Sequence, residues 1–223
     1  MKNQTLIFAL IVAFMPIFIS EAQTVKIGSQ TFMTENLNVE VFRNGDPIPQ
    51  AKTKEEMEAF FKAKEPAWCY YDFKKSNGNK YGKMYNGYAM MDARGLAPEG
   101  WRIPSEEDFM SLVEFLGGGQ QALLKLKSNS GWSDNKNGTN SSGFSATPGG
   151  LTSGSDFLNL GYMTHYWSSS PMGENNFFTT LRLSYNDELF YIEIDGKEIS
   201  NLKDPLIVGI HSGNFSYVRC IKE

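Results

Sequence analysis

The chain has 223 residues, a formal net charge of −4 and 41% hydrophobic residues. Its length and apolar content suffice for one domain with its own core, and no stretch has the composition of a linker between two domains. Phosphate binding depends on clustered Lys and Arg, and because the sequence has no such cluster, we expect no nucleic acid partner.

Residues 1–22 have the pattern of a secretory signal peptide. Lys2 precedes an apolar run from Leu6 to Ile19, and Ala22 supplies the small residue before a predicted cleavage site. The run is shorter than the roughly 20 residues of a membrane-spanning helix, and no later stretch is as apolar. We therefore expect a secreted, periplasmic or cell-surface protein, with one domain over residues 23–223 and no transmembrane segment in the mature chain. An uncleaved N-terminal anchor is the alternative.

Two cysteines, Cys69 and Cys220, are predicted to form a disulfide. An exported chain meets an oxidising compartment, where such bonds form and persist. Two separately buried thiols are the alternative, because free cysteine is often buried and a bridge requires two Cα atoms that lie close together.

The first half of the chain predicts a hairpin and two capped helices. Apolar and polar residues alternate on both sides of Gly28, which favours a pair of strands. Thr53 and Glu56 have the spacing of a capping box and predict a helix over residues 54–64. The Tyr-rich segment 68–95 reads as irregular backbone, and Ser105 then begins a second helix that ends at the glycines 117–119. A short further helical turn follows.

The second half predicts a long ordered loop and then strands. Residues 129–155 are rich in Gly, Ser, Asn and Thr but carry Trp132, Phe144 and Leu151, which we expect to attach this loop to the core. The last third alternates apolar and polar residues, and Asp195-Gly196 marks a hairpin. The predicted class is α+β with a mainly antiparallel sheet.

A series of motifs in fixed order identifies a family. These motifs are "NLN", "RNGDPIP", "PAWCYYD", "YGKMYNGYA", "GLAPEGWRIPSEEDF", "LGG", "LK", "GFSATPGG", "YWSSS" and "SYVRCIK". Together they resemble the Fibrobacter succinogenes major paralogous domain family of secreted bacterial proteins, from Val25 to Lys222. The resemblance implies a fold similar to that of C-type lectins, shared with formylglycine-generating enzymes and with phage and bacterial receptor-binding proteins.

Three features depart from the pattern of that family. Gly87 stands where members commonly carry Trp, and Arg102 stands where they commonly carry His. The segment 185–213 is also longer than the resemblance leads us to expect.

The sequence offers little support for catalysis. Cys69 and Cys220 lack the motif context in which the related formylglycine-generating enzymes hold copper. His165 and His211 are the only histidines, and neither accompanies a Gly-x-Ser-x-Gly nucleophile turn. The acidic residues 106–108 fit the first turn of a helix better than a pair of hydrolytic carboxylates. An unrecognised hydrolase or oxidase on the same fold is the alternative.

A lectin-like fold makes Ca²⁺ a candidate cofactor, because many C-type lectins hold sugars through Ca²⁺. The motifs Glu-Pro-Asn, Gln-Pro-Asp and Trp-Asn-Asp are absent. The oxygens of Glu174–Asn176 and of Asp187 and Glu188 are more typical of solvated turns. We therefore predict no cofactor, with Ca²⁺ possible but unsupported by any motif.

The remaining signal is a predicted binding face. Trp101 and Trp167 belong to motifs that resemble the framework of the family, so we assign them to structure. Less framework-like residues are expected on loops near the late strands, and the predicted ligand-binding set is His165, Tyr166, Glu174, Asn175, Asn176 and Asn186. The predicted function is an exported, non-catalytic module that binds a glycan or a surface protein. An accessory subunit of a surface assembly is a further alternative.

Overall fold

The computed structural model describes residues 23–173, 176–185, 193–194, 197–198 and 207–223. The predicted signal peptide lies outside the described residues, and so do Glu174, Asn175 and Asn186, together with Asp187 and Glu188. The described part combines short helices with mainly antiparallel sheets, which confirms the predicted α+β class.

The described helices are α1 (Lys54–Ala63), α2 (Lys75–Tyr81), α3 (Gly87–Met90), α4 (Glu106–Phe115) and α5 (Gly119–Leu126), with 3₁₀ turns at Tyr71–Phe73 and Ser133–Asn135. The described strands are β1 (Thr24–Ile27), β2 (Gln30–Met33), β3 (Trp68–Cys69), β4 (Met84–Asn86), β5 (Trp101–Arg102), β6 (Leu151–Ser153), β7 (Asp156–Leu158), β8 (Met163–Pro171), β9 (Phe177–Ser184), β10 (Glu193–Ile194), β11 (Lys197–Glu198), β12 (Ile207–His211), β13 (Phe215–Ser216) and β14 (Ile221–Lys222).

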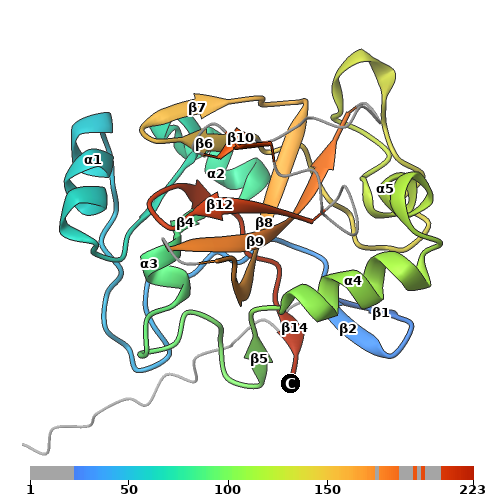
Figure 1. Ribbon diagram of the computed structural model, residues 1–223, viewed down its shortest axis with the longest axis horizontal. Helices are drawn as coiled ribbons and strands as arrows, with labels where there is room; N and C mark the ends of the chain where they lie inside the picture. Colours follow the sequence, from blue (N-terminus) through green and yellow to red (C-terminus); the bar gives the residue numbers. More distant parts are fainter. Residues whose placement is uncertain (1–22, 174–175, 186–192, 195–196, 199–206) are drawn as a thin grey trace, which may run out of the picture.

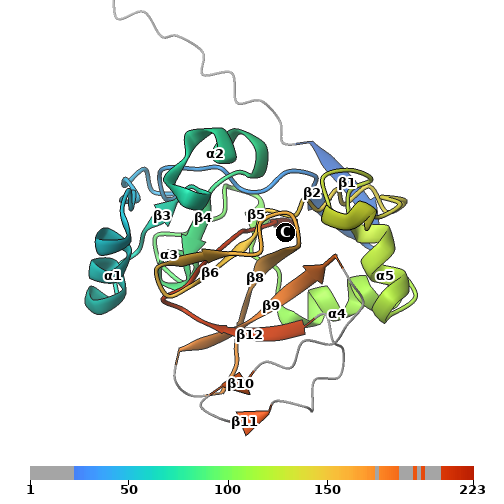
Figure 2. The same ribbon diagram turned by 90° about the horizontal axis from the view of Figure 1, so that it is seen from above.

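The strands form three small sheets and two separate hairpins. The sheet orders are β1-β2-β14-β5, β12-β9-β8 and β13-β4-β3, and the hairpins are β6-β7 and β10-β11. Strand β14 thus joins the N-terminal hairpin to the strand that precedes α4. Both views place α1 and α5 at opposite ends of the molecule, with β8, β9 and β12 between them (Figures 1 and 2).

The capped helices form where the sequence predicts them. Thr53 Oγ1 accepts a hydrogen bond from the backbone N–H of Glu56 at 3.2 Å, and α1 ends before Lys64, which adopts the left-handed conformation. Ser105 and Asp108 make a complete capping box at the start of α4. Arg102 also donates to both carboxylate oxygens of Asp108, so the departure from the family pattern at Arg102 strengthens this cap.

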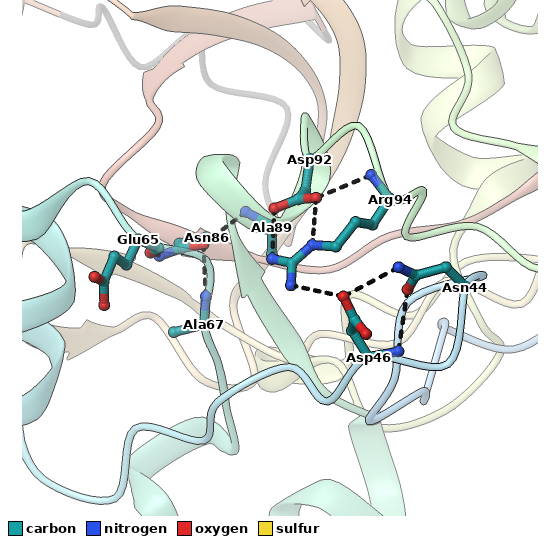
Figure 3. Close-up of polar contacts among 8 residues, drawn as sticks. All are labelled: Asn44, Asp46, Glu65, Ala67, Asn86, Ala89, Asp92 and Arg94. Atoms are coloured by element: carbon teal, nitrogen blue, oxygen red, sulfur yellow. Dashed lines mark hydrogen bonds and ion pairs between the residues drawn. The ribbon is translucent and has the colours of Figure 1, made fainter.

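The prediction of irregular backbone over residues 68–95 is wrong in part, because β3, α2, β4 and α3 lie there. Non-local hydrogen bonds stabilise these short elements. Asn86 Oδ1 accepts from the backbone N–H of Ala89, which caps α3, and from that of Ala67, while Nδ2 donates to Glu65 O (Figure 3). The Asn86 side chain therefore orders the segment through bonds to residues 19 and 21 positions earlier in the sequence.

The turn in "RNGDPIP" is attached to the loop after α3 by one arginine. Arg94 donates to both oxygens of Asp92 at 2.8 Å and reaches Asp46 at 3.3 Å (Figure 3). Asn44 Oδ1 accepts from the backbone N–H of Asp46, which closes the turn. These contacts position the turn against the rest of the fold.

Gly87 permits a close approach of two segments. A Cβ atom built at Gly87 would lie 2.6 Å from Ser212 Cα, and the backbone N–H of Gly87 donates to Ser212 O at 2.7 Å. No side chain fits there without moving the backbone. The glycine at this position, where the family commonly carries Trp, is therefore required by the turn after β12.

Aromatic framework residues lie where the motifs indicate. Trp167 is fully buried, and its Nε1 donates to Tyr85 O at 2.8 Å. Trp101 pairs with Lys222 across β5 and β14 and packs, partly exposed, against the same group of buried residues. In the long loop, Trp132 and Phe144 are buried, which confirms that aromatic side chains attach it to the core.

The predicted disulfide is wrong, because Cys69 and Cys220 are both free thiols. The two belong to different clusters of buried apolar residues: the cluster of Cys69 includes Phe32 and Phe109, whereas that of Cys220 includes Trp167. Burial raises the pKa of both thiols, that of Cys220 to about 12. They act as small apolar side chains that fill the core.

Candidate functional site

The predicted loop location of His165 and Tyr166 is wrong, because both lie inside β8. Their residues are 4% and 0% exposed. Strand β8 pairs with β9 on one side, and Tyr166 bridges to Tyr217 on the other. Neither side chain reaches the surface, so neither can touch a ligand that binds there.

His165 is held as a neutral ring. Its Nδ1 lies 3.3 Å from Thr180 Oγ1 and its Nε2 lies 3.3 Å from Met163 Sδ, so both ring nitrogens have a neutral neighbour. Burial, together with the charge of Arg182, lowers the pKa of His165 to about 3. The histidine is a structural residue between two strands.

Asn176 is the one described member of the predicted set that is exposed. Its carbonyl accepts a hydrogen bond from the backbone N–H of Ser212 at 2.8 Å. The next residue, Phe177, lies 5.2 Å from the ring of His211, which in turn lies 5.4 Å from Phe61 of α1. Asn176 therefore borders an aromatic surface, which we call the Phe61 patch.

A cleft of about 450 Å³ lies elsewhere, where three segments meet. One wall is the segment after β2, with Thr34, Glu35, Asn36 and Asn38. The second is the C-terminal half of α2 through Gly82, and the third carries Ser145 and Thr147, with Gln23 at the edge. None of these residues belongs to the ligand-binding set predicted from sequence.

The buried side chain of Arg219 connects two of these walls. Its Nη1 donates to Thr34 O at 2.9 Å and also to Phe144 O, and its guanidinium lies 4.6 Å from the ring of Phe144. Burial lowers the pKa of Arg219. Because the group makes hydrogen bonds to both segments, it fixes the distance between the first wall and the third.

Asn36 is oriented by the same arginine. Its Oδ1 accepts from Arg219 Nη2 at 2.6 Å, and its Nδ2 donates to Tyr81 O at 2.8 Å. An amide group has two N–H donors, so one remains for a ligand. Gly82 has a φ of +81°, and a Cβ there would lie 3.1 Å from that of Asn36, so glycine brings the end of α2 close to the first wall.

The chemistry of the lining suits a ligand with many hydroxyl groups. Its described side chains are mostly amides and hydroxyls, with Glu35 as the carboxylate and Lys80 as the ammonium group. Amide and hydroxyl groups both donate and accept hydrogen bonds, as sugar hydroxyls do. Hydrolysis of a glycosidic bond uses two carboxylates, and the described lining supplies one.

The sequence did contain a signal for this cleft. In "NLN", Leu37 is buried while Asn36 and Asn38 reach the cleft. This motif also belongs to the series that indicates the family. Its polar, apolar, polar pattern could have indicated that the two amides face outwards together.

The described residues contain no group of three or more His, Cys, Asp or Glu side chains arranged to hold a metal ion. No helix within them is both long and apolar enough to cross a membrane.

The comparisons with known proteins agree with the resemblance seen in the sequence. The model of the Fibrobacter succinogenes major domain family matches residues 25–222. No curated protein and no solved structure matches the chain.

Proposed function

Because the chain belongs to the Fibrobacter succinogenes major domain family, we propose that it is an exported, non-catalytic module that binds a glycan at or outside the bacterial cell surface. Residues 1–22 are removed during export, and residues 23–223 act as one domain. The glycan binds in the cleft formed by residues 34–38, 78–82 and 145–147.

The observation that carries the proposal is the lining of the cleft. A volume of about 450 Å³ falls within the usual range for small-ligand sites. Fixed amides such as that of Asn36 lose little conformational entropy when a ligand binds, since their orientation is set in advance. A rigid, polar cleft of this size accommodates one or two sugar rings.

The test is a glycan array with the full-length protein purified after export, in Ca²⁺ and in chelator. Affinity for an array-selected oligosaccharide is then measured by calorimetry. Replacing the exposed cleft residues Asn79 and Lys80 together by alanine should weaken binding about tenfold, the equivalent of about one hydrogen bond to a charged group.

Lys75→Ala is the matched control, because Lys75 is exposed on the same helix and does not line the cleft. Equal affinity in the Asn79/Lys80 double variant and in the wild type would contradict the cleft as the site. Release of reducing sugar from the bound oligosaccharide would identify a hydrolase instead.

A protein ligand is the second candidate, and the Phe61 patch favours it. Phe61 is 46% exposed, and exposed aromatic side chains are frequent in protein interfaces. Capture of one specific surface protein that is lost on Phe61→Ser, with no glycan bound, would favour this alternative.

A further inference from the structure

Lys83 is a buried lysine between α2 and β4. Its side chain is 4% exposed, and its Nζ lies 4.8 Å from the ring of Trp68 and 5.6 Å from that of Tyr70. Two aromatic rings therefore shield the amino group from water.

A carboxamide and a carboxylate from another segment meet this amino group. Lys83 Nζ lies 2.7 Å from Asn38 Oδ1, 3.2 Å from Asn38 O and 3.2 Å from Glu40 Oε1. The two segments are 45 residues apart in sequence. The buried amino group of Lys83 thus lies within hydrogen-bond distance of the Asn38 side-chain amide oxygen and of the Glu40 carboxylate, whose side chain is 63% exposed.

We propose that Lys83 and Asn38 form a covalent isopeptide bond in the folded protein. Holding two reactants in contact replaces a slow bimolecular reaction by an intramolecular one, which accelerates reactions by many orders of magnitude. The bond forms once in each chain, after folding has brought the three groups together. The proposal does not depend on which ligand the cleft binds, and Asn38 also lines the cleft.

The atoms balance without an oxidant or any other reactant. Glu40 accepts a proton from the Lys83 ammonium group, and the freed electron pair of Nζ attacks Cγ of Asn38. A second proton leaves Nζ as the new C–N bond forms. Both protons pass through Glu40 to Nδ2, the Cγ–Nδ2 bond breaks, and the nitrogen leaves as an ammonium ion. Glu40 ends as the carboxylate that it was.

The position of the bond gives it a consequence for the fold. It joins residue 38, in the first wall of the cleft, to residue 83, directly after the second wall, and it closes a loop that contains α1, β3 and α2. A covalent link across this loop restricts the unfolded chain in the way a disulfide does. Unlike a disulfide, the isopeptide bond survives reduction. Because Cys69 and Cys220 are free thiols, no disulfide between them restricts the unfolded chain.

The test is peptide mapping by mass spectrometry on the full-length protein purified after export, reduced and denatured before digestion. We expect a branched peptide that joins the fragment containing Asn38 to the fragment containing Lys83, with a mass one ammonia below their sum. Fragmentation should place the link at these two residues. Fragments containing Lys127, a buried lysine that contacts the backbone carbonyls of Ser184 and Tyr185, should stay linear.

Recovery of both fragments in linear form from folded wild-type protein would overturn the proposal and would identify Lys83 as an ammonium group held by its three acceptors. A link from Asn38 to Lys80 would overturn it as well. Lys83→Arg keeps the charge and should abolish the branched peptide. Glu40→Gln changes a largely exposed side chain, so folding is retained, and should slow formation of the link about a hundredfold.

Discussion

Arg219 and Asn36 form the contact on which the shape of the cleft depends. The guanidinium donates through Nη2 to Asn36 Oδ1 at 2.6 Å and through Nε to the same oxygen at 3.2 Å. Because the arginine is fully buried, it is inaccessible to water that could replace this acceptor. The orientation of a surface amide is thus determined from inside the protein.

Replacing Asn36 by alanine should destabilise the fold, because it leaves N–H groups of a buried guanidinium without their acceptor. We expect the free energy of unfolding to fall by about 2 to 3 kcal/mol. Urea unfolding followed by circular dichroism measures this. Asn79→Ala, at an exposed cleft position, is the control and should change the value by less than about 0.5 kcal/mol. Equal stability of the two variants would show that the Arg219 contact contributes little.

His165 should make the protein less stable in acid. Its folded-state pKa of about 3 lies below the usual value of 6.5, so the folded protein holds the ring neutral while the unfolded chain protonates it. The stability is fully present above pH 6.5 and is lost as the pH falls from there towards 3. The contribution to the slope approaches about 1.4 kcal/mol per pH unit.

The measurement is urea unfolding of wild type and His165→Gln at pH 7, 6 and 5, a range that limits the titration of carboxylates. The difference between the two free energies should shrink as the pH falls. A constant difference across the series would mean that His165 titrates in the folded protein as it does in the unfolded chain.

The two cysteines should be unreactive until the chain unfolds. Both thiols are buried with a raised pKa, and the thiolate is the reactive form. A thiol reagent should therefore label neither cysteine in native buffer and both in denaturant, and reductant should leave the melting temperature unchanged. A fall in melting temperature on reduction would contradict free thiols and would support the disulfide that the sequence led us to predict.

Gly87→Ala should destabilise the protein through a direct clash. The added methyl group would meet Ser212 Cα at 2.6 Å, and the backbone on both sides would have to move. Such overpacking costs about 1 to 3 kcal/mol. Ser76→Ala, on the exposed side of α2, is the comparison. If Gly87→Ala unfolds at the same urea concentration as Ser76→Ala, the two segments are less tightly packed than the distances indicate.

Local signals explain why the helices were predictable. Thr53 and Ser105 each cap a helix through residues three positions away, so the whole signal lies within one turn. The elements between residues 68 and 95 are two to seven residues long and depend on contacts such as that of Asn86 with Glu65. No window of sequence contains such a contact, and these elements were missed.

The errors at His165 and Tyr166 have a different cause. Alternation predicted the strand correctly, but β8 is buried on both faces from Met163 to Ser168. In such a strand, polar residues such as His165 point into the interior and bind neighbouring side chains. The polarity of His165 therefore led to the wrong prediction that its side chain is exposed.

The cleft could not be assembled from sequence, because its walls come from three segments that only the fold brings together. The chemistry of each wall was visible in part, as the two amides of "NLN" show. The contact of Asn36 with Arg219, 183 residues further along the chain, was not.

The most direct test of the account is to map an array-selected oligosaccharide onto the protein by amide chemical-shift changes in NMR. We predict that the largest changes fall in residues 34–38, 78–82 and 145–147. Changes confined to Asn176, Phe177 and His211 would contradict the cleft as the binding site and would place the ligand on the Phe61 patch.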